Sequence, residues 1–85
     1  MNTSKTLSEA SLSTIARVIR SDWQKVNYAA IPYLEAMETL TTIKDKYYCD
    51  SGESVVAYFL SNATSWRGEV AKAVKLELNK RLKGK

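Results

Sequence analysis

The 85-residue sequence contains no histidine, and this absence excludes several kinds of chemistry at once. Histidine is the usual proton shuttle near neutral pH, the usual base beside a serine or cysteine nucleophile, and the commonest zinc ligand. The acidic residues have no spacing that demands a paired-carboxylate site. The glycine-containing basic motif Trp66-Arg67-Gly68 lacks the run of glycines that a phosphate-binding loop requires. We therefore expect no enzymatic activity, no cofactor and no metal ion.

Cysteine and long apolar runs are also scarce. Cys49 has no second cysteine with which to form an internal disulfide, whereas small secreted domains usually carry several. It is expected to be an inert thiol, because no neighbouring histidine or strongly basic cluster would lower its pKa. The longest apolar run covers residues 55–60, far short of the roughly 18–20 residues of a membrane-spanning helix, and no apolar segment follows Lys5. The sequence predicts a cytoplasmic protein without a membrane partner.

The remaining composition is that of an ordinary folded protein, with 45% hydrophobic and 26% charged residues, one proline and three glycines. A chain of this length allows one domain with a small core. We expect residues 1–85 to form a single small helical domain, with flexible residues 1–10.

Apolar residues recur at helical spacing along most of the chain, and no useful length of strand alternation occurs. The first predicted helix begins at a cap formed by Ser8 or Ser11 and extends to Val26. Pro32 suits the first turn of a second helix, predicted over residues 32–41. The following segment, up to Cys49, has no clear period and is predicted to be a loop.

Two more helices are predicted in the second half of the chain. Asp50 as the N-cap and Glu53 in the first turn favour a helix that ends near Asn62. Because this helix has almost no polar face, we expect the others to pack around it. The last helix is predicted over residues 66–82, with caps on both sides: Thr64 or Ser65 before it and Gly84 after it. The predicted fold is all-α, a compact bundle of about four helices with a largely buried central third helix.

The net charge of +4 is distributed unevenly along the chain. Residues 1–30 carry four basic and two acidic residues, residues 31–60 carry two and five, and residues 61–85 carry seven and two. Four lysines of the last predicted helix lie within about 140° of arc, opposite its apolar face: Lys72, Lys75, Lys80 and Lys83. Such a ridge is able to follow a phosphate backbone, but lysines in a last turn also complement the helix dipole and favour solubility. Nucleic-acid binding is therefore an alternative prediction.

A second set of residues is predicted to contact a protein partner. Two adjacent tyrosines in a loop are hard to bury together, and exposed tyrosines are enriched at interfaces. Leu76 falls among the lysines of the last helix, and the polar side of the first helix is a weaker candidate. The predicted partner-binding residues are Tyr47, Tyr48, Leu76, Arg17, Arg20 and Gln24. Trp23 and Trp66 are expected in the core, whereas Asp22 and Arg67 are compatible with structure or with contact.

Five short motifs occur in order within residues 15–78: Arg20-Ser21-Asp22-Trp23, Pro32-Tyr33-Leu34-Glu35-Ala36-Met37, Asp50-Ser51-Gly52, Tyr58-Phe59-Leu60-Ser61-Asn62-Ala63 and Trp66-Arg67-Gly68. Together they resemble a group of short uncharacterised proteins encoded by tailed bacteriophages and prophages. The sequence departs from that pattern at Tyr47-Tyr48-Cys49, where a glycine is more usual after the first tyrosine. The resemblance implies no role for particular residues. It implies an accessory protein in a bacterial cytoplasm that binds and redirects a host factor or a defence complex.

The sequence therefore favours a non-enzymatic, phage-like protein that modulates or inhibits a host or defence protein complex. One alternative is a sequence-nonspecific nucleic-acid-binding protein that uses the basic last helix. The other is a small structural or oligomeric phage component that hides an apolar surface between identical subunits.

Overall fold

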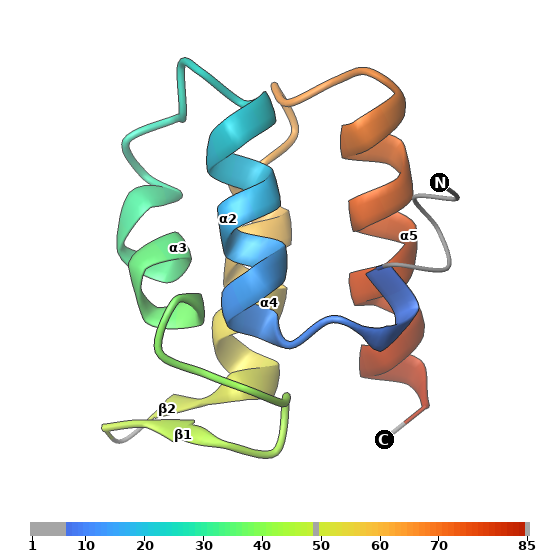
Figure 1. Ribbon diagram of the computed structural model, residues 1–85. Coiled ribbons are helices and arrows are strands. Elements are labelled where there is room, and N and C mark those ends of the chain that lie inside the picture. The colour runs from blue at the N-terminus through green and yellow to red at the C-terminus, as the bar shows by residue number, and fades with distance from the viewer. Residues whose placement is uncertain (1–6, 49, 85) are drawn as a thin grey trace.

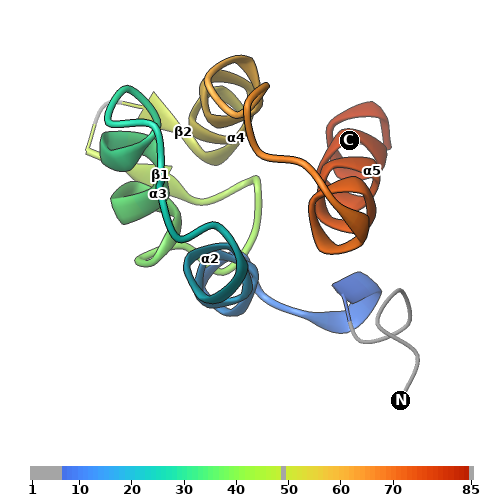
Figure 2. The same cartoon turned by 90° about the horizontal axis from the view of Figure 1, so that it is seen from above.

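The computed structural model describes residues 7–48 and 50–84. This part of the chain forms the following elements: α2 (Leu12–Asp22), α3 (Ile31–Met37), β1 (Lys46–Tyr47), β2 (Asp50–Ser51), α4 (Gly52–Ser61) and α5 (Glu69–Lys83). A helical turn at residues 7–9 precedes α2. Figure 1 shows α2 in front of α4, with α3 on one side of them and α5 on the other. Seen from above in Figure 2, these helices surround a common interior.

The interior is apolar and receives side chains from every helix. The largest fully buried residues include Phe59 of α4, Leu34 of α3 and Leu78 of α5, together with Ile15 and Ile19 of α2. The helical fold expected from hydrophobic periodicity is confirmed. The expectation of a strictly all-α fold is wrong, because β1 and β2 form a small antiparallel sheet below α3 and α4 (Figure 1).

The two-stranded sheet replaces part of the predicted loop that ends at Cys49. Lys46 lies opposite Ser51 and Tyr47 lies opposite Asp50. The approach to β1 is fixed by Asp45, whose carboxylate accepts the backbone N–H groups of residues 41 and 42 at 2.9 and 3.0 Å. The carbonyl of Asp45 also accepts the N–H of residue 52 at 2.7 Å. These contacts bring two segments without strand alternation side by side, which hydrophobic periodicity alone does not reveal.

Helix α4 is not the central helix that its sequence predicts. Its buried residues lie on one side, whereas Ala57 and Tyr58 on the other side are exposed. The ring of Tyr58 stacks on Tyr33 of α3, with ring centroids 5.4 Å apart. Stacking at the surface lets an aromatic residue remain outside the core while part of its ring is covered. The core therefore lies between the helices, and α4 contributes one face to it.

The N-terminal end of α2 is capped as predicted, but contacts from a distant segment shorten α3. Ser11 Oγ accepts the N–H of Thr14 at 3.2 Å, which is an ordinary serine cap. The N–H groups of Leu12 and Ser13 donate to the carbonyls of residues 41 and 40 at 3.0 and 2.9 Å. The chain after Met37 therefore turns toward α2, and α3 ends four residues before the predicted residue 41.

The other helix boundaries also differ from the sequence prediction. Helix α2 ends at Asp22, because Trp23 leaves the helical conformation (ψ 89°), so Val26 lies outside it. The N-cap of α4 is Ser51, whose Oγ accepts the N–H of Ser54 at 3.1 Å; Asp50 belongs to β2. Helix α5 begins only after Gly68, whose φ of 115° is a left-handed conformation that interrupts a helix.

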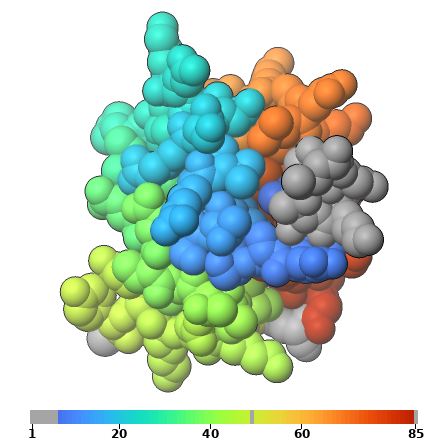
Figure 3. Space-filling model, viewed as in Figure 1, coloured from blue at the N-terminus to red at the C-terminus, as the bar shows by residue number. Residues whose placement is uncertain are grey.

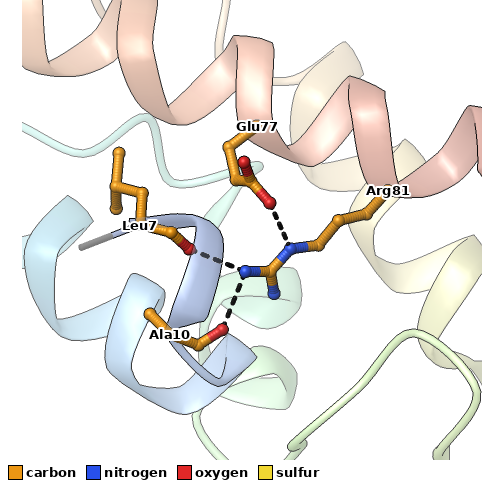
Figure 4. Close-up of polar contacts among 4 residues, drawn as sticks. All are labelled: Leu7, Ala10, Glu77 and Arg81. Carbon is orange, nitrogen blue, oxygen red and sulfur yellow. Dashed lines mark hydrogen bonds and ion pairs between the residues drawn. The ribbon is translucent and has the colours of Figure 1, made fainter. Parts of the chain in front are cut away.

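The segment before α2 is held against α5, although residues 1–10 are predicted to be flexible. Residues 1–6 lie outside the described part of the chain. Leu7 is buried, and its carbonyl accepts a hydrogen bond from Arg81 Nη2 at 2.7 Å. The same nitrogen donates to the carbonyl of Ala10 at 2.8 Å, while Glu77 holds Arg81 Nε at 2.6 Å (Figure 4). Figure 3 shows this blue segment lying across the surface toward the red end of α5.

Candidate functional site

Helix α5 presents a polar side to solvent, and we call this side the α5 outer face. Residues three, four, seven and eleven positions apart lie on the same side of a helix. The α5 outer face consists of residues that follow this spacing: Lys72, Leu76, Asn79, Lys80 and Lys83, all of them exposed. The opposite side of α5 packs into the core through Ala71, Val74 and Leu78. The outer face is therefore the part of α5 that remains free for contact.

Leu76 lies in the middle of this face and is 72% exposed. A shallow depression of about 480 Å³ lies beside it, lined by Leu76, Asn79, Lys80, Lys83 and Gly84. The side-chain amide of Asn79 donates to the carbonyl one helical turn earlier, at 2.9 Å. This contact turns part of its polar group toward the helix backbone. The centre of the face is thus apolar and its edges are positively charged.

The negative charges of α5 lie away from the centre of the outer face. Glu77 is committed to the ion pair with Arg81, in which both side chains are mostly buried. Glu69 stands in the first turn, where a carboxylate complements the positive end of the helix dipole. Arg81 is itself occupied by backbone carbonyls of the N-terminal segment. From Leu76 to Lys83 the charged residues of the outer face are lysines.

Lys75 does not belong to this face, although the sequence predicts a ridge of four lysines. Its side chain is half-buried, and its Nζ donates to the carbonyl of Trp66 at 2.6 Å. The lysine therefore stabilises the turn that leads into α5. Lys72, Lys80 and Lys83 remain exposed, so three of the four predicted lysines are available to a partner.

The predicted contact residues Tyr47 and Tyr48 lie on the hairpin. Tyr48 is 86% exposed and has a positive φ of 55°. Its ring contacts the ring of the half-buried Tyr47 edge-on, with ring centroids 4.7 Å apart. Cys49 lies outside the described residues, so the structure does not test the prediction that its thiol is inert. Figures 1 and 2 both show the hairpin and α5 on different sides of the molecule. Tyr48 and Leu76 therefore do not form one continuous surface.

The weaker set predicted on the first helix is dispersed in the structure. Arg20 forms an ion pair with Glu38 of the chain after α3, at 2.7 Å. Gln24 lies in the turn beyond the end of α2. Arg17 lines a shallow groove of about 380 Å³ between α2 and Val70 of α5. These three side chains do not converge on one site.

Asp22 has a structural role that the sequence leaves open. Its Oδ2 accepts the indole N–H of Trp66 at 2.8 Å. The rings of Trp66 and Trp23 stack, with ring centroids 5.7 Å apart and an angle of 12° between their planes. Both residues are buried as predicted. Arg67, by contrast, is exposed beside the start of α5 and makes no contact that indicates a function.

The sequence did not predict the exposure of two aromatic residues. Tyr58 falls within the apolar run at residues 55–60, on a helix predicted to be largely buried, yet it is 56% exposed. Tyr28, in the connection between α2 and α3, is 83% exposed and had no helical pattern to mark it. Both lie away from α5, so they provide matched exposed residues with which to compare Leu76.

No set of three potential metal-ligating side chains occurs among residues 7–48 and 50–84. The pKa of Asp45 is lowered, because the backbone N–H groups of Thr42 and Thr41 donate hydrogen bonds to its carboxylate. These bonds order the turn before β1, so the lowered pKa has a structural explanation.

Comparisons with models of protein families, with curated proteins and with solved structures find no match to this chain. The resemblance to short phage and prophage proteins therefore stays a prediction. Within the described residues, no helix combines the length and the apolar character needed to cross a membrane.

Proposed function

We propose that this protein is a non-enzymatic, phage-like accessory protein of the bacterial cytoplasm that binds a host or defence protein complex and modulates or inhibits it. Its contact surface is the α5 outer face. The observation that carries this proposal is the exposure of Leu76, 72%, at the centre of a face whose other exposed side chains are polar or positively charged.

The arrangement of the α5 outer face resembles a protein interface in its distribution of polarity. Such interfaces have an apolar centre that loses its water on binding and a polar rim that stays wet. Burying a leucine that is exposed in the free protein contributes about 1.5–3 kcal/mol. Leu76 supplies the apolar centre, while Lys80 and Lys83 supply the rim.

Support for the remaining parts of the proposal comes from the sequence. The lack of histidine argues against acid–base catalysis of the usual kind. The five ordered motifs support the phage context, since they are the residues that carry the resemblance to short phage and prophage proteins. Neither feature identifies the partner. The partner must be inferred from the surface of α5.

The test is affinity capture from a nuclease-treated bacterial lysate with wild type, Leu76→Ala and Tyr28→Ala. Tyr28 is the matched control, because it is similarly exposed but lies outside α5. We expect wild type and Tyr28→Ala to retain the same host protein in stoichiometric amount, and Leu76→Ala to lose it. Equal retention by all three proteins, or retention of nucleic acid alone in untreated lysate, would contradict the proposal.

Nucleic-acid binding remains the second candidate, because Lys72, Lys80 and Lys83 are exposed on one side of α5. Three phosphate contacts would give a log–log salt slope near −2.7, or a loss of roughly 40-fold in affinity between 50 and 200 mM salt. Leu76 would not contribute to such binding, since phosphate contacts require charge and hydrogen-bond donors. The effect of Leu76→Ala therefore separates the two functions.

An oligomeric phage component, the third candidate, would instead show a sedimentation rate that rises with protein concentration.

A further inference from the structure

We infer that the α5 outer face binds an acidic amphipathic helix of the partner protein, with an apolar side chain of that helix seated beside Leu76. The inference rests on the proposed function and adds the chemical nature of the partner.

The charge of the face favours a negative partner. Lys72, Lys80 and Lys83 are exposed along one side of α5. The ion pair of Glu77 with Arg81 leaves neither of these two charges free to balance the lysines. A partner with carboxylates at its rim would complement the lysines and associate faster through electrostatic attraction. A neutral or basic partner would leave the three lysines without counter-charges.

The shape of the face favours a helix as the binding element. Lys72 and Lys83 are eleven positions apart, so the face is about 16 Å long, or three helical turns. A single exposed helix offers a narrow convex ridge, which packs well into the groove between the side-chain rows of another helix. The depression of about 480 Å³ beside Leu76 is large enough to receive an apolar side chain.

Two other sides of α5 are occupied by contacts within the protein. One side is buried in the core through Val74 and Leu78. Another side carries Arg81, which is fastened to the carbonyls of Leu7 and Ala10 (Figure 4). The partner helix therefore meets α5 along the stripe from Lys72 to Lys83.

Leu76 also distinguishes this partner from a nucleic acid. Phosphates would be bound by the lysines alone, and an exposed leucine between them would gain nothing from a phosphate backbone. An acidic amphipathic helix uses both features of the face: its carboxylates meet the lysines and its apolar stripe covers Leu76. Binding of this helix thus depends on the lysines and on Leu76, and substitutions of the lysines and of Leu76 test the two contributions separately.

The experiment is an NMR titration of the ¹⁵N-labelled full chain with a synthetic helical peptide of about 18 residues, or five turns. The peptide carries a leucine stripe flanked by glutamates. One control peptide has alanine in place of each leucine, another has lysine in place of each glutamate, and a DNA duplex is titrated separately. The protein variants are Leu76→Ala, the double variant Lys80→Glu with Lys83→Glu, and Lys44→Glu, which alters an exposed lysine outside α5.

We expect the acidic leucine peptide to produce saturable shift changes centred on residues 76–84 of wild type and of Lys44→Glu. Leu76→Ala should weaken this binding about tenfold or more, because the lost burial corresponds to at least 1.4 kcal/mol. The double charge reversal should weaken it to a similar extent. The two control peptides should bind more weakly than the acidic leucine peptide.

The inference would be overturned if the acidic peptide produced no saturable changes on α5, or if its alanine version bound as tightly. Tighter binding of the DNA duplex would replace the acidic helix with a nucleic acid. Changes in α5 shifts on dilution of the protein alone would assign the face to a second copy. If the peptide fails while Leu76→Ala still abolishes capture of a host protein, only the partner chemistry is wrong; if Leu76→Ala leaves capture intact, the proposed function fails as well.

Discussion

Asp22→Ala tests the hydrogen bond that joins the end of α2 to the turn before α5. Trp66 is only 2% exposed, and its indole N–H donates to Asp22 Oδ2 at 2.8 Å. A buried donor that loses its acceptor costs about 1–3 kcal/mol. Because Asp22 itself is exposed, water reaches part of this site, and we expect a loss at the lower end of the range, about 1–1.5 kcal/mol. For a domain of this size, such a loss lowers Tm by about 5–10 °C.

The control is a double-mutant cycle with Trp66→Phe, which removes the indole N–H but keeps an aromatic ring. Asp22→Ala should be nearly neutral in the Trp66→Phe background, since no donor then loses its acceptor. Thermal and urea denaturation followed by circular dichroism provide the four stabilities. If Asp22→Ala lowers stability equally in both backgrounds, the hydrogen bond is not the cause of the effect and the reasoning is refuted.

Three further perturbations test separate parts of the fold. Gly52→Ala should sharply lower the urea midpoint, because a Cβ atom there would lie 2.8 Å from the backbone oxygen of Ile43; an unchanged midpoint would contradict this. Arg81→Met, which keeps the aliphatic stem, should increase hydrogen exchange in residues 7–10, and unchanged exchange would show that the guanidinium does not hold this segment. The folded-state pKa of Asp45 lies below its ordinary value of 3.8, so its ionised carboxylate stabilises the fold above that pH and this contribution disappears as pH falls through the folded pKa. The stability difference between wild type and Asp45→Asn should therefore shrink below pH 3.8, and a difference independent of pH would count against the account.

Local signals in the sequence predicted the features that depend on local interactions. Ser11 caps α2 and Gly84 follows α5, as their positions beside apolar periodic segments indicate. Trp23 and Trp66 are buried as predicted, although Trp23 follows the end of α2 and Trp66 precedes the start of α5. The two helix ends are decided within one or two helical turns, which explains why the sequence was sufficient for them.

Features decided by distant residues were missed or misplaced. The carbonyls of Leu40 and Thr41 are drawn to the start of α2, which ends α3 early. Asp22 and Trp66 are separated by 44 positions, and Arg81 and Leu7 by 74. Hydrophobic periodicity contains no information on such pairs, so their hydrogen bonds and the resulting helix ends could not be derived from it.

The candidate site was predicted in part. The position of Leu76 opposite the apolar side of its helix correctly indicated that it is exposed, and the same argument holds for Lys72, Lys80 and Lys83. Lys75 lies at one edge of this arc, but it turns toward the carbonyl of Trp66 because the chain before α5 is a turn and not a helix. Predicting its orientation would have required the correct start of α5.

The most direct test of the proposed protein-binding role is the affinity of wild type and Leu76→Ala for the captured host protein, measured by isothermal titration calorimetry. Because Leu76 is 72% exposed, its replacement should leave the thermal stability of the free protein nearly unchanged, so any loss of affinity reports on the interface. We predict equal melting temperatures and an affinity lower by about tenfold or more for Leu76→Ala. Equal affinities of the two proteins would contradict the central claim that the α5 outer face binds the partner through Leu76.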